Sequence, residues 1–136
     1  MNVLVYAFRS DADQHERYRN WLEDIVNAEH AYGIAPQVLA SVVRVTTHPK
    51  IFPRPSLPAD AFAFCRVLLE QPHCTVIAPG ERHWGIFEAL CAAAAAKGNL
   101  VQDAWLAALA IESGCEWITT DRDFARFPDL QWRTPW

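Results

Sequence analysis

The chain has 136 residues, of which 51% are hydrophobic and 21% charged, with a formal net charge of −4. This length is typical of one domain, so we predict a single domain over residues 1–136. No apolar run approaches the ~20 residues that span a bilayer, and the N-terminus lacks the pattern of a secretory signal. We therefore expect a cytoplasmic protein without membrane association. Four cysteines without CxxC spacing favour buried free thiols and argue against a zinc site.

The charges are unevenly distributed. Residues 31–59 contain no acid, whereas Arg44, Lys50 and Arg54 contribute +3, so the other residues together carry −7. A basic segment in an otherwise acidic chain suits a phosphate-bearing substrate. Three basic residues in 29 positions are equally compatible with an ordinary solvated surface.

In chain order, residues 3–8 have the propensity of a strand. Asp13 with Glu16 forms a capping box that predicts the start of an amphipathic helix. Pro36 suits the first turn of another helix. The remaining elements are predicted from the same kinds of signal: strands Tyr32–Ala35, Cys74–Ala78 and Leu130–Trp132, and helices Pro58–Glu70 and Glu81–Lys97. The alternation of strands and helices indicates an α/β fold with a parallel sheet.

The stretch from Asn99 to Phe127 reads as a helix, a tight turn, a short strand and an acidic loop. Asn99 and Gln102 form a second capping box, and Gly114 is a typical helix stop. The aromatic and β-branched content of Glu116–Thr120 predicts a strand.

Three carboxylates belong to this stretch: Asp103 in the first turn of the predicted helix, and Asp121 and Asp123 after the strand. The start of the helix should lie beside the end of the strand, so we expect the three carboxylates to converge. Converging carboxylates repel one another unless a cation neutralises them, which predicts a divalent-metal site. Alternatively, Asp103 interacts with the helix dipole, and Asp121 and Asp123 cap the next turn.

Four segments resemble one known family. Residues 99–128, NLVQDAWLAALAIESGCEWITTDRDFARFP, look like the C-terminal signature of PIN-domain ribonucleases, close to the VapC toxins of bacterial toxin–antitoxin pairs. The segment NVLVYAF (2–8) resembles the first motif of the family, and TTHPKIF (46–52) and PGERHW (79–84) resemble segments of one VapC subgroup.

The resemblance implies a three-layer PIN-like domain with a short parallel sheet flanked by helices. It implies a metal-dependent endoribonuclease that hydrolyses RNA phosphodiester bonds, is neutralised by a VapB-like antitoxin, and forms a homodimer. Asp103 and Asp121 would hold Mg²⁺ or Mn²⁺, and Asp123 would be a further ligand or a water-orienting base. The tryptophans expected at an exterior interface are Trp84, Trp132 and Trp136.

Two positions depart from the family pattern. The first acid of the family would stand directly before Met1, at the end of a strand, so we expect that strand to be missing or truncated. Ser41 stands where many members carry a glutamate ligand. Weak metal binding follows, and an alternative is a PIN-like protein that binds antitoxin or RNA without cleaving. A small-molecule hydrolase has little support, because no nucleophile motif is present.

Overall fold

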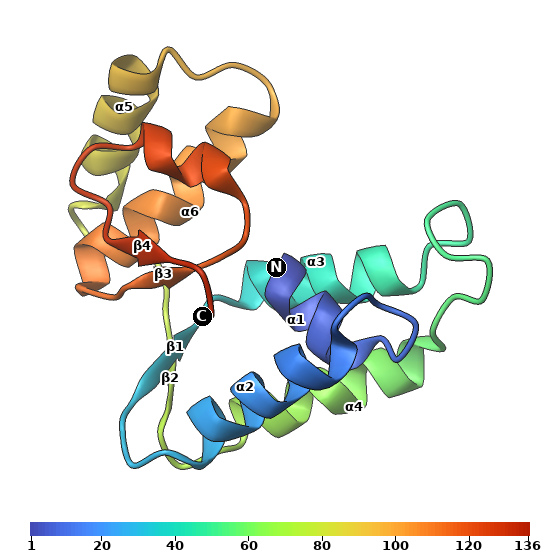
Figure 1. Ribbon diagram of the computed structural model, residues 1–136. Helices are drawn as coiled ribbons and strands as arrows, with labels where there is room; N and C mark the ends of the chain where they lie inside the picture. The colour runs from blue at the N-terminus through green and yellow to red at the C-terminus, as the bar shows by residue number, and fades with distance from the viewer. The chain divides into compact units, whose positions relative to one another are not determined.

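The computed structural model describes residues 1–136, which form two compact units, Met1–Val76 and Ile77–Trp136 (Figure 1). The first unit contains helices α1 (Asn2–Phe8), α2 (His15–Asn27), α3 (Pro36–Thr46) and α4 (Pro58–Leu69), and strands β1 (Tyr32–Ile34) and β2 (Cys74–Val76). The second contains helices α5 (His83–Ala94) and α6 (Asn99–Ser113), strands β3 (Trp117–Ile118) and β4 (Trp132–Arg133), and the 3₁₀-helix η1 (Arg122–Arg126).

The chain begins with a helix rather than a strand. The strand propensity of residues 3–8 is therefore misleading, and α1 begins at Asn2. The Asn2 side chain accepts a hydrogen bond from the amide of Val3 at 2.7 Å. The Tyr6 ring packs on Tyr18 of α2 with ring centroids 5.0 Å apart. Packing against neighbouring helices thus overrides the intrinsic preference of β-branched residues.

Helix α2 begins at His15, and its N-cap Gln14 has a left-handed backbone with φ of 56° and no side-chain capping bond. The capping box predicted from Asp13 and Glu16 is therefore wrong. Helix α3 does begin at Pro36, as predicted, because proline supplies a helical φ where no amide donor is needed.

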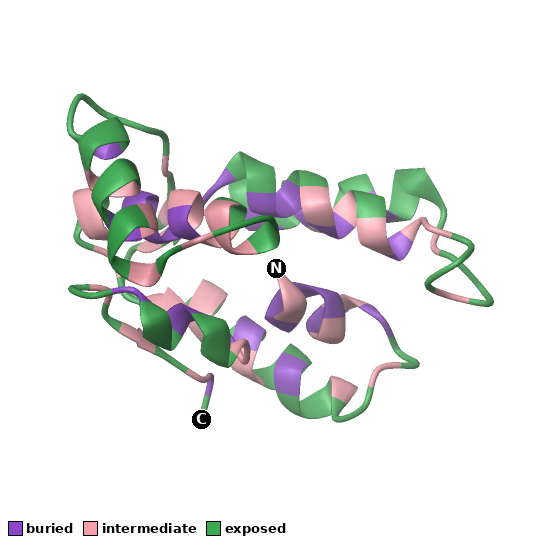
Figure 2. Ribbon diagram, turned by 90° about the horizontal axis from the view of Figure 1, so that it is seen from above, coloured by how far each residue is buried: buried purple, intermediate pink, exposed green.

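Strands β1 and β2 pair in parallel over three residues, with Tyr32 opposite Cys74 and Ile34 opposite Val76. The Tyr32 hydroxyl donates to the Leu68 carbonyl at 2.5 Å, which ties this two-stranded sheet to the end of α4. Burial raises the pKa of Tyr32 to about 12, in keeping with a hydroxyl that stays protonated and donates. Along α2, α3 and α4, buried and exposed residues alternate around the axis, whereas α1 has no exposed residue (Figure 2).

In the second unit, α5 packs against α6, and the buried core consists mostly of small and aromatic residues: Leu90, Ala104, Ala107, Ala108, Phe124 and Phe127. Alanines at the buried positions of α6 let neighbouring backbones approach closely. The short strands β3 and β4 pair in parallel, with Trp117 opposite Trp132.

The sequence predicted the C-terminal end of α6 correctly, but not its N-terminal cap. Gly98 is the N-cap, with φ of 58° and ψ of −129°, and Asn99 is the first helical residue without a side-chain cap. The capping box of Asn99 and Gln102 is therefore wrong, and Asp103 lies in the second turn rather than the first. The stop at Gly114 is confirmed: its φ of 70° is left-handed, and the Cys115 amide donates to the Ala110 carbonyl at 2.9 Å.

The α/β class with parallel strands is confirmed. The parallel pairing is divided between two separate two-stranded sheets, β1–β2 and β3–β4, instead of one continuous sheet. The structure contains no helix with both the length and the apolar character that a bilayer span requires.

Candidate metal centre

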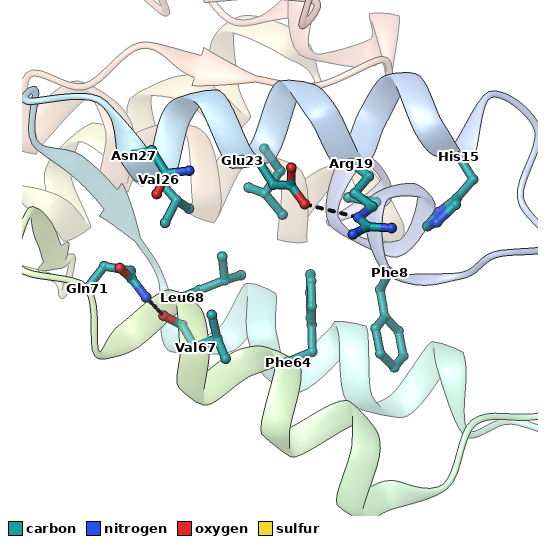
Figure 3. Close-up of a pocket in the computed structure, with 12 residues that line it drawn as sticks. Phe8, His15, Arg19, Glu23, Val26, Asn27, Phe64, Val67, Leu68 and Gln71 are labelled. Atoms are coloured by element: carbon teal, nitrogen blue, oxygen red, sulfur yellow. Dashed lines mark hydrogen bonds and ion pairs between the residues drawn. The ribbon is translucent and has the colours of Figure 1, made fainter.

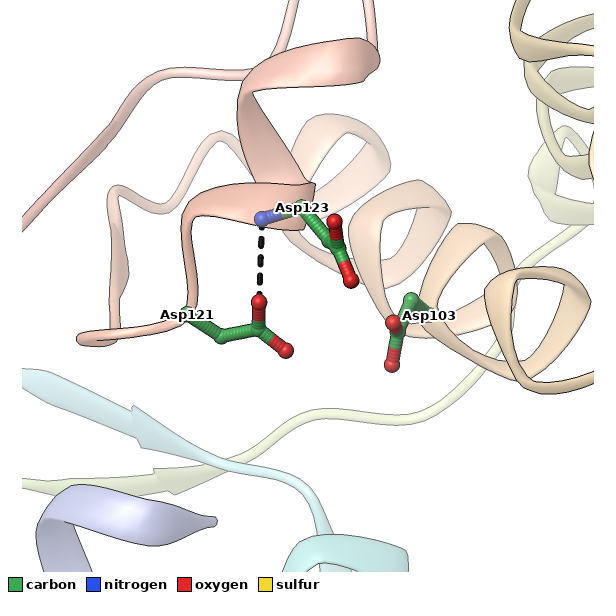
Figure 4. A group of neighbouring side chains, drawn as sticks. All are labelled: Asp103, Asp121 and Asp123. Atoms are coloured by element: carbon green, nitrogen blue, oxygen red, sulfur yellow. Dashed lines mark hydrogen bonds between the residues drawn. The ribbon is translucent and has the colours of Figure 1, made fainter.

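The carboxylates of Asp103, Asp121 and Asp123 come together in the second unit. One oxygen from each lies within 4.8 Å of the others, and all three side chains face the same space (Figure 4). Asp103 belongs to α6, whereas Asp121 and Asp123 stand at the start of η1, just after β3. The sequence prediction that these three acids converge is thus confirmed, although it rested on a helix start that was one residue off.

The turn after β3 orients Asp121 by two hydrogen bonds. The Asp121 amide donates to Thr119 Oγ1 at 3.1 Å, and Asp121 Oδ1 in turn accepts the amide of Asp123 at 2.9 Å. Asp121 is therefore the N-cap of η1, as the alternative reading of the sequence held. A carboxylate has two oxygens, so this bond occupies one of them and leaves Oδ2 available to a ligand.

The electrostatics of the cluster disfavour three bare negative charges. Burial raises the pKa of the Asp103 carboxyl, and the neighbouring charges of Asp121 and Asp123 raise it further. None of the three aspartates forms an ion pair with an arginine; the ion pair in this unit joins Arg133 to Glu116 at 2.8 Å. A bound divalent cation would offset this repulsion, and oxygen donors of this kind are those that Mg²⁺ and Mn²⁺ prefer. The three residues therefore fit a hard divalent cation.

Thr119 is a residue of this centre that the sequence prediction missed. Thr119 is only 2% exposed, and its amide donates to the Arg133 carbonyl at 3.0 Å, extending the β3–β4 ladder by one residue. Thr119 thus joins the sheet to the backbone of Asp121. The signal was present in the letters Thr-Thr-Asp, because a threonine two residues before an acid can accept its amide in a local turn.

Ser41, the position where the family pattern carries a glutamate, lies in α3 and is half-buried. A serine hydroxyl supplies no negative charge, so it does not replace a carboxylate ligand. Of the three tryptophans expected on the exterior, Trp84 is 67% exposed and Trp136 is 44% exposed. Trp132 is half-buried and packs against the core of the second unit, so it presents less surface than the other two tryptophans.

A second concave surface lies in the first unit, between α2 and α4 (Figure 3). This groove encloses about 560 Å³. Its α2 side carries the exposed ion pair of Arg19 and Glu23, 3.0 Å apart, and its α4 side carries Phe64, Val67 and Leu68. We call it the α2–α4 groove. Val67 is 55% exposed, so an apolar side chain stands open to solvent there.

Comparison with known proteins agrees with this geometry. The family model of the PIN domain matches residues 1–130. VapC ribonuclease Mb2897 of Mycobacterium bovis is 43% identical over 135 residues, which cover 99% of this chain and 92% of that protein. Ribonuclease VapC25 of Mycobacterium tuberculosis is 40% identical over 131 residues, covering 96% and 92% of the two chains.

Among solved structures, a chain from the crystal structure of VapBC2 from Rickettsia felis, bound to a DNA fragment from their promoter, matches with a TM-score of 0.68. The match covers 98% of this chain and 93% of that one at 21% identity, which supports the fold alone. The fold is that of a PIN domain. The chain belongs to the PIN-domain family and, within it, to the VapC ribonucleases.

Replacing Thr119 by valine should disturb the centre without removing a carboxylate. Valine keeps the shape but leaves the Asp121 amide without its acceptor, which should lower stability by about 1 kcal/mol. Loss of an orienting group typically weakens metal binding about tenfold or more. Urea unfolding and Mn²⁺ titration of the two variants Thr119→Val and Thr119→Ser measure both effects. The serine variant keeps the hydroxyl and should bind Mn²⁺ as the wild type does; equal affinity of the valine variant would remove Thr119 from this role.

Proposed function

We propose that this protein is a metal-dependent endoribonuclease, the toxin of a toxin–antitoxin pair. The observation that carries the proposal is the convergence of Asp103, Asp121 and Asp123 within 4.8 Å in a chain that is 43% identical to a VapC ribonuclease. We propose further that both units work together as one PIN domain, since a single family model covers residues 1–130.

Each carboxylate has a distinct setting that suggests its task. Asp103 is half-buried and Asp121 is fixed by two hydrogen bonds, so these two would be the carboxylates that hold Mg²⁺ or Mn²⁺. Asp123 is exposed, so its carboxylate reaches solvent and either adds a ligand or accepts a proton from the attacking water. When bound, the divalent cation activates a water and offsets charge on the scissile phosphate.

The direct test is cleavage of single-stranded RNA by purified protein with Mn²⁺, with Mg²⁺ and with EDTA. We expect cleavage with either cation and none with EDTA. A protein that binds RNA or antitoxin and never cleaves with Mn²⁺ would instead support the alternative, a binding-only PIN-like protein.

The partner we propose is an antitoxin of the VapB type, bound in the α2–α4 groove. Support comes from the fold shared with a chain of a VapBC complex, and from the groove itself. The α4 side of the groove is apolar, with Phe64, Val67 and Leu68, and lies opposite the Arg19–Glu23 ion pair of α2. This combination suits an amphipathic helix, which presents apolar residues along one face. The exposed aromatic side chains of Trp84 and Trp136 make self-association a further part of this proposal.

A further inference from the structure

The segment Thr47–Leu57, which connects α3 to α4, forms a closed surface loop that we call the basic loop. The amide of Ser56 donates to the Thr46 carbonyl at 2.8 Å and brings the two ends of the loop together. Inside the loop, the amides of Ile51 and Phe52 both donate to the His48 carbonyl at 3.1 Å. Three prolines in the same segment restrict its backbone further, because each one fixes φ.

A buried arginine anchors this loop. Arg9 is only 8% exposed, and its Nη1 donates to the Arg54 carbonyl at 2.8 Å and to Ser56 Oγ at 3.0 Å. Its guanidinium lies 4.1 Å from the centre of the Phe52 ring. Asp11 pairs with the same guanidinium, with Nε 2.9 Å from Oδ1. Because a buried guanidinium is costly without partners, Arg9 holds the loop in place while Asp11 neutralises the charge of Arg9 itself.

The positive charges that the basic loop exposes to solvent are those of Lys50 and Arg54, not that of the buried Arg9. Lys50 and Arg54 are exposed, as is Arg44 in the last turn of α3, and none of the three takes part in an ion pair. No acid occurs from residue 31 to residue 59, so nothing within this stretch neutralises them. The remaining residues carry a net −7, which repels a polyanion.

We propose that the basic loop binds the phosphate backbone of RNA through Lys50 and Arg54, which deepens the proposed function and rests on it. Phosphate contacts of this kind supply affinity and position the strand, without reading its sequence. A loop already fixed by Arg9 loses little conformational entropy when it binds, so the contacts are made at low cost.

The test is the salt dependence of RNA binding without cleavage. Fluorescence anisotropy of a labelled single-stranded RNA, with protein in EDTA at several salt concentrations, gives the slope of log K against log salt. Each lost phosphate contact on a single strand should reduce the slope by about 0.7, hence by about 1.4 for the Lys50→Gln/Arg54→Gln double variant. Relative to 1 M salt, a slope change of 1.4 corresponds to a loss of affinity of about 25-fold at 0.1 M salt.

The matched control is Arg17→Gln/Arg66→Gln, which removes the same charge from exposed positions of α2 and α4. Equal slopes for the loop variant and the control would overturn the proposal, as would a loop variant that loses antitoxin binding while it keeps RNA binding. If the loop variant has a reduced salt slope but the wild type never cleaves RNA, the loop proposal holds and the proposed nuclease function fails. If the wild type cleaves RNA but the loop variant has an unchanged salt slope, the nuclease function holds and the loop proposal fails.

Discussion

Replacing Asp103 by asparagine should abolish RNA cleavage and yet stabilise the metal-free protein. Asparagine keeps the size of the side chain but removes a charge that the cation needs, so activity should fall at least about 100-fold. In the absence of metal, that same charge faces Asp121 and Asp123 in a half-buried position, where it is unfavourable.

The sign of the stability change follows from the raised pKa of Asp103 in the folded protein. An acid whose pKa is higher in the folded state than in the unfolded state lowers stability as pH rises through these two values. The loss is complete above the folded pKa and absent below the ordinary pKa of an aspartate. The Asp103→Asn protein in EDTA should therefore melt higher than the wild type at pH 7, with the difference vanishing at low pH.

Thermal unfolding in EDTA at several pH values and RNA cleavage with Mn²⁺ check the two effects separately. The control is Asp129→Asn, which removes an exposed acid of the same unit from a left-handed position, φ of 66°, that asparagine also tolerates. Cleavage by Asp103→Asn at the wild-type rate would show that this carboxylate takes no part in the reaction.

Replacing Val67 by glutamate should strongly weaken binding of the proposed antitoxin. Val67 is 55% exposed in the α2–α4 groove, so the substitution leaves the fold intact and puts a charge where an apolar helix face would bind. An unpaired charge buried in an interface typically costs several kcal/mol, so the affinity should fall at least about 100-fold. RNA cleavage should be retained, because Asp103, Asp121 and Asp123 are untouched.

Titration calorimetry with the cognate antitoxin measures this change. Phe62→Glu is the matched control, since Phe62 lies on the same helix, is 51% exposed and is outside the groove. If the Val67 and Phe62 variants bind the antitoxin equally well, the α2–α4 groove is not the antitoxin site.

The sequence was most informative where local signals and tertiary structure agree. Gly114 ends α6 in the left-handed conformation that only glycine adopts easily, and this turn brings the chain back so that Asp121 and Asp123 meet Asp103. Pro36 begins α3 for a similar reason, because its ring fixes a helical φ. Both are backbone constraints of a single residue, so they can be predicted without neighbours.

The incorrect predictions concern segments whose conformation depends on tertiary contacts or on a neighbouring residue. Residues 3–8 form helix α1 although their β-branched and aromatic side chains favour a strand, because packing on α2 decides the conformation. The capping boxes at Asp13 and Asn99 fail because Gln14 and Gly98 enter their helices with positive φ, which places the helix start elsewhere. The hydrogen bond from the Asp121 amide to Thr119 is local, but the burial of Thr119 depends on how β3 pairs with β4, a long-range contact that the sequence prediction did not include.

The most direct test of the metal centre is a calorimetric titration of Mn²⁺ into metal-free protein at pH 7. The three carboxylates predict one saturable site in the wild type that is greatly weakened in both Asp103→Asn and Asp121→Asn and unchanged in Asp129→Asn. Absence of Mn²⁺ binding by the wild type, or equal affinity in all four proteins, would contradict the assignment of Asp103, Asp121 and Asp123 as a metal centre.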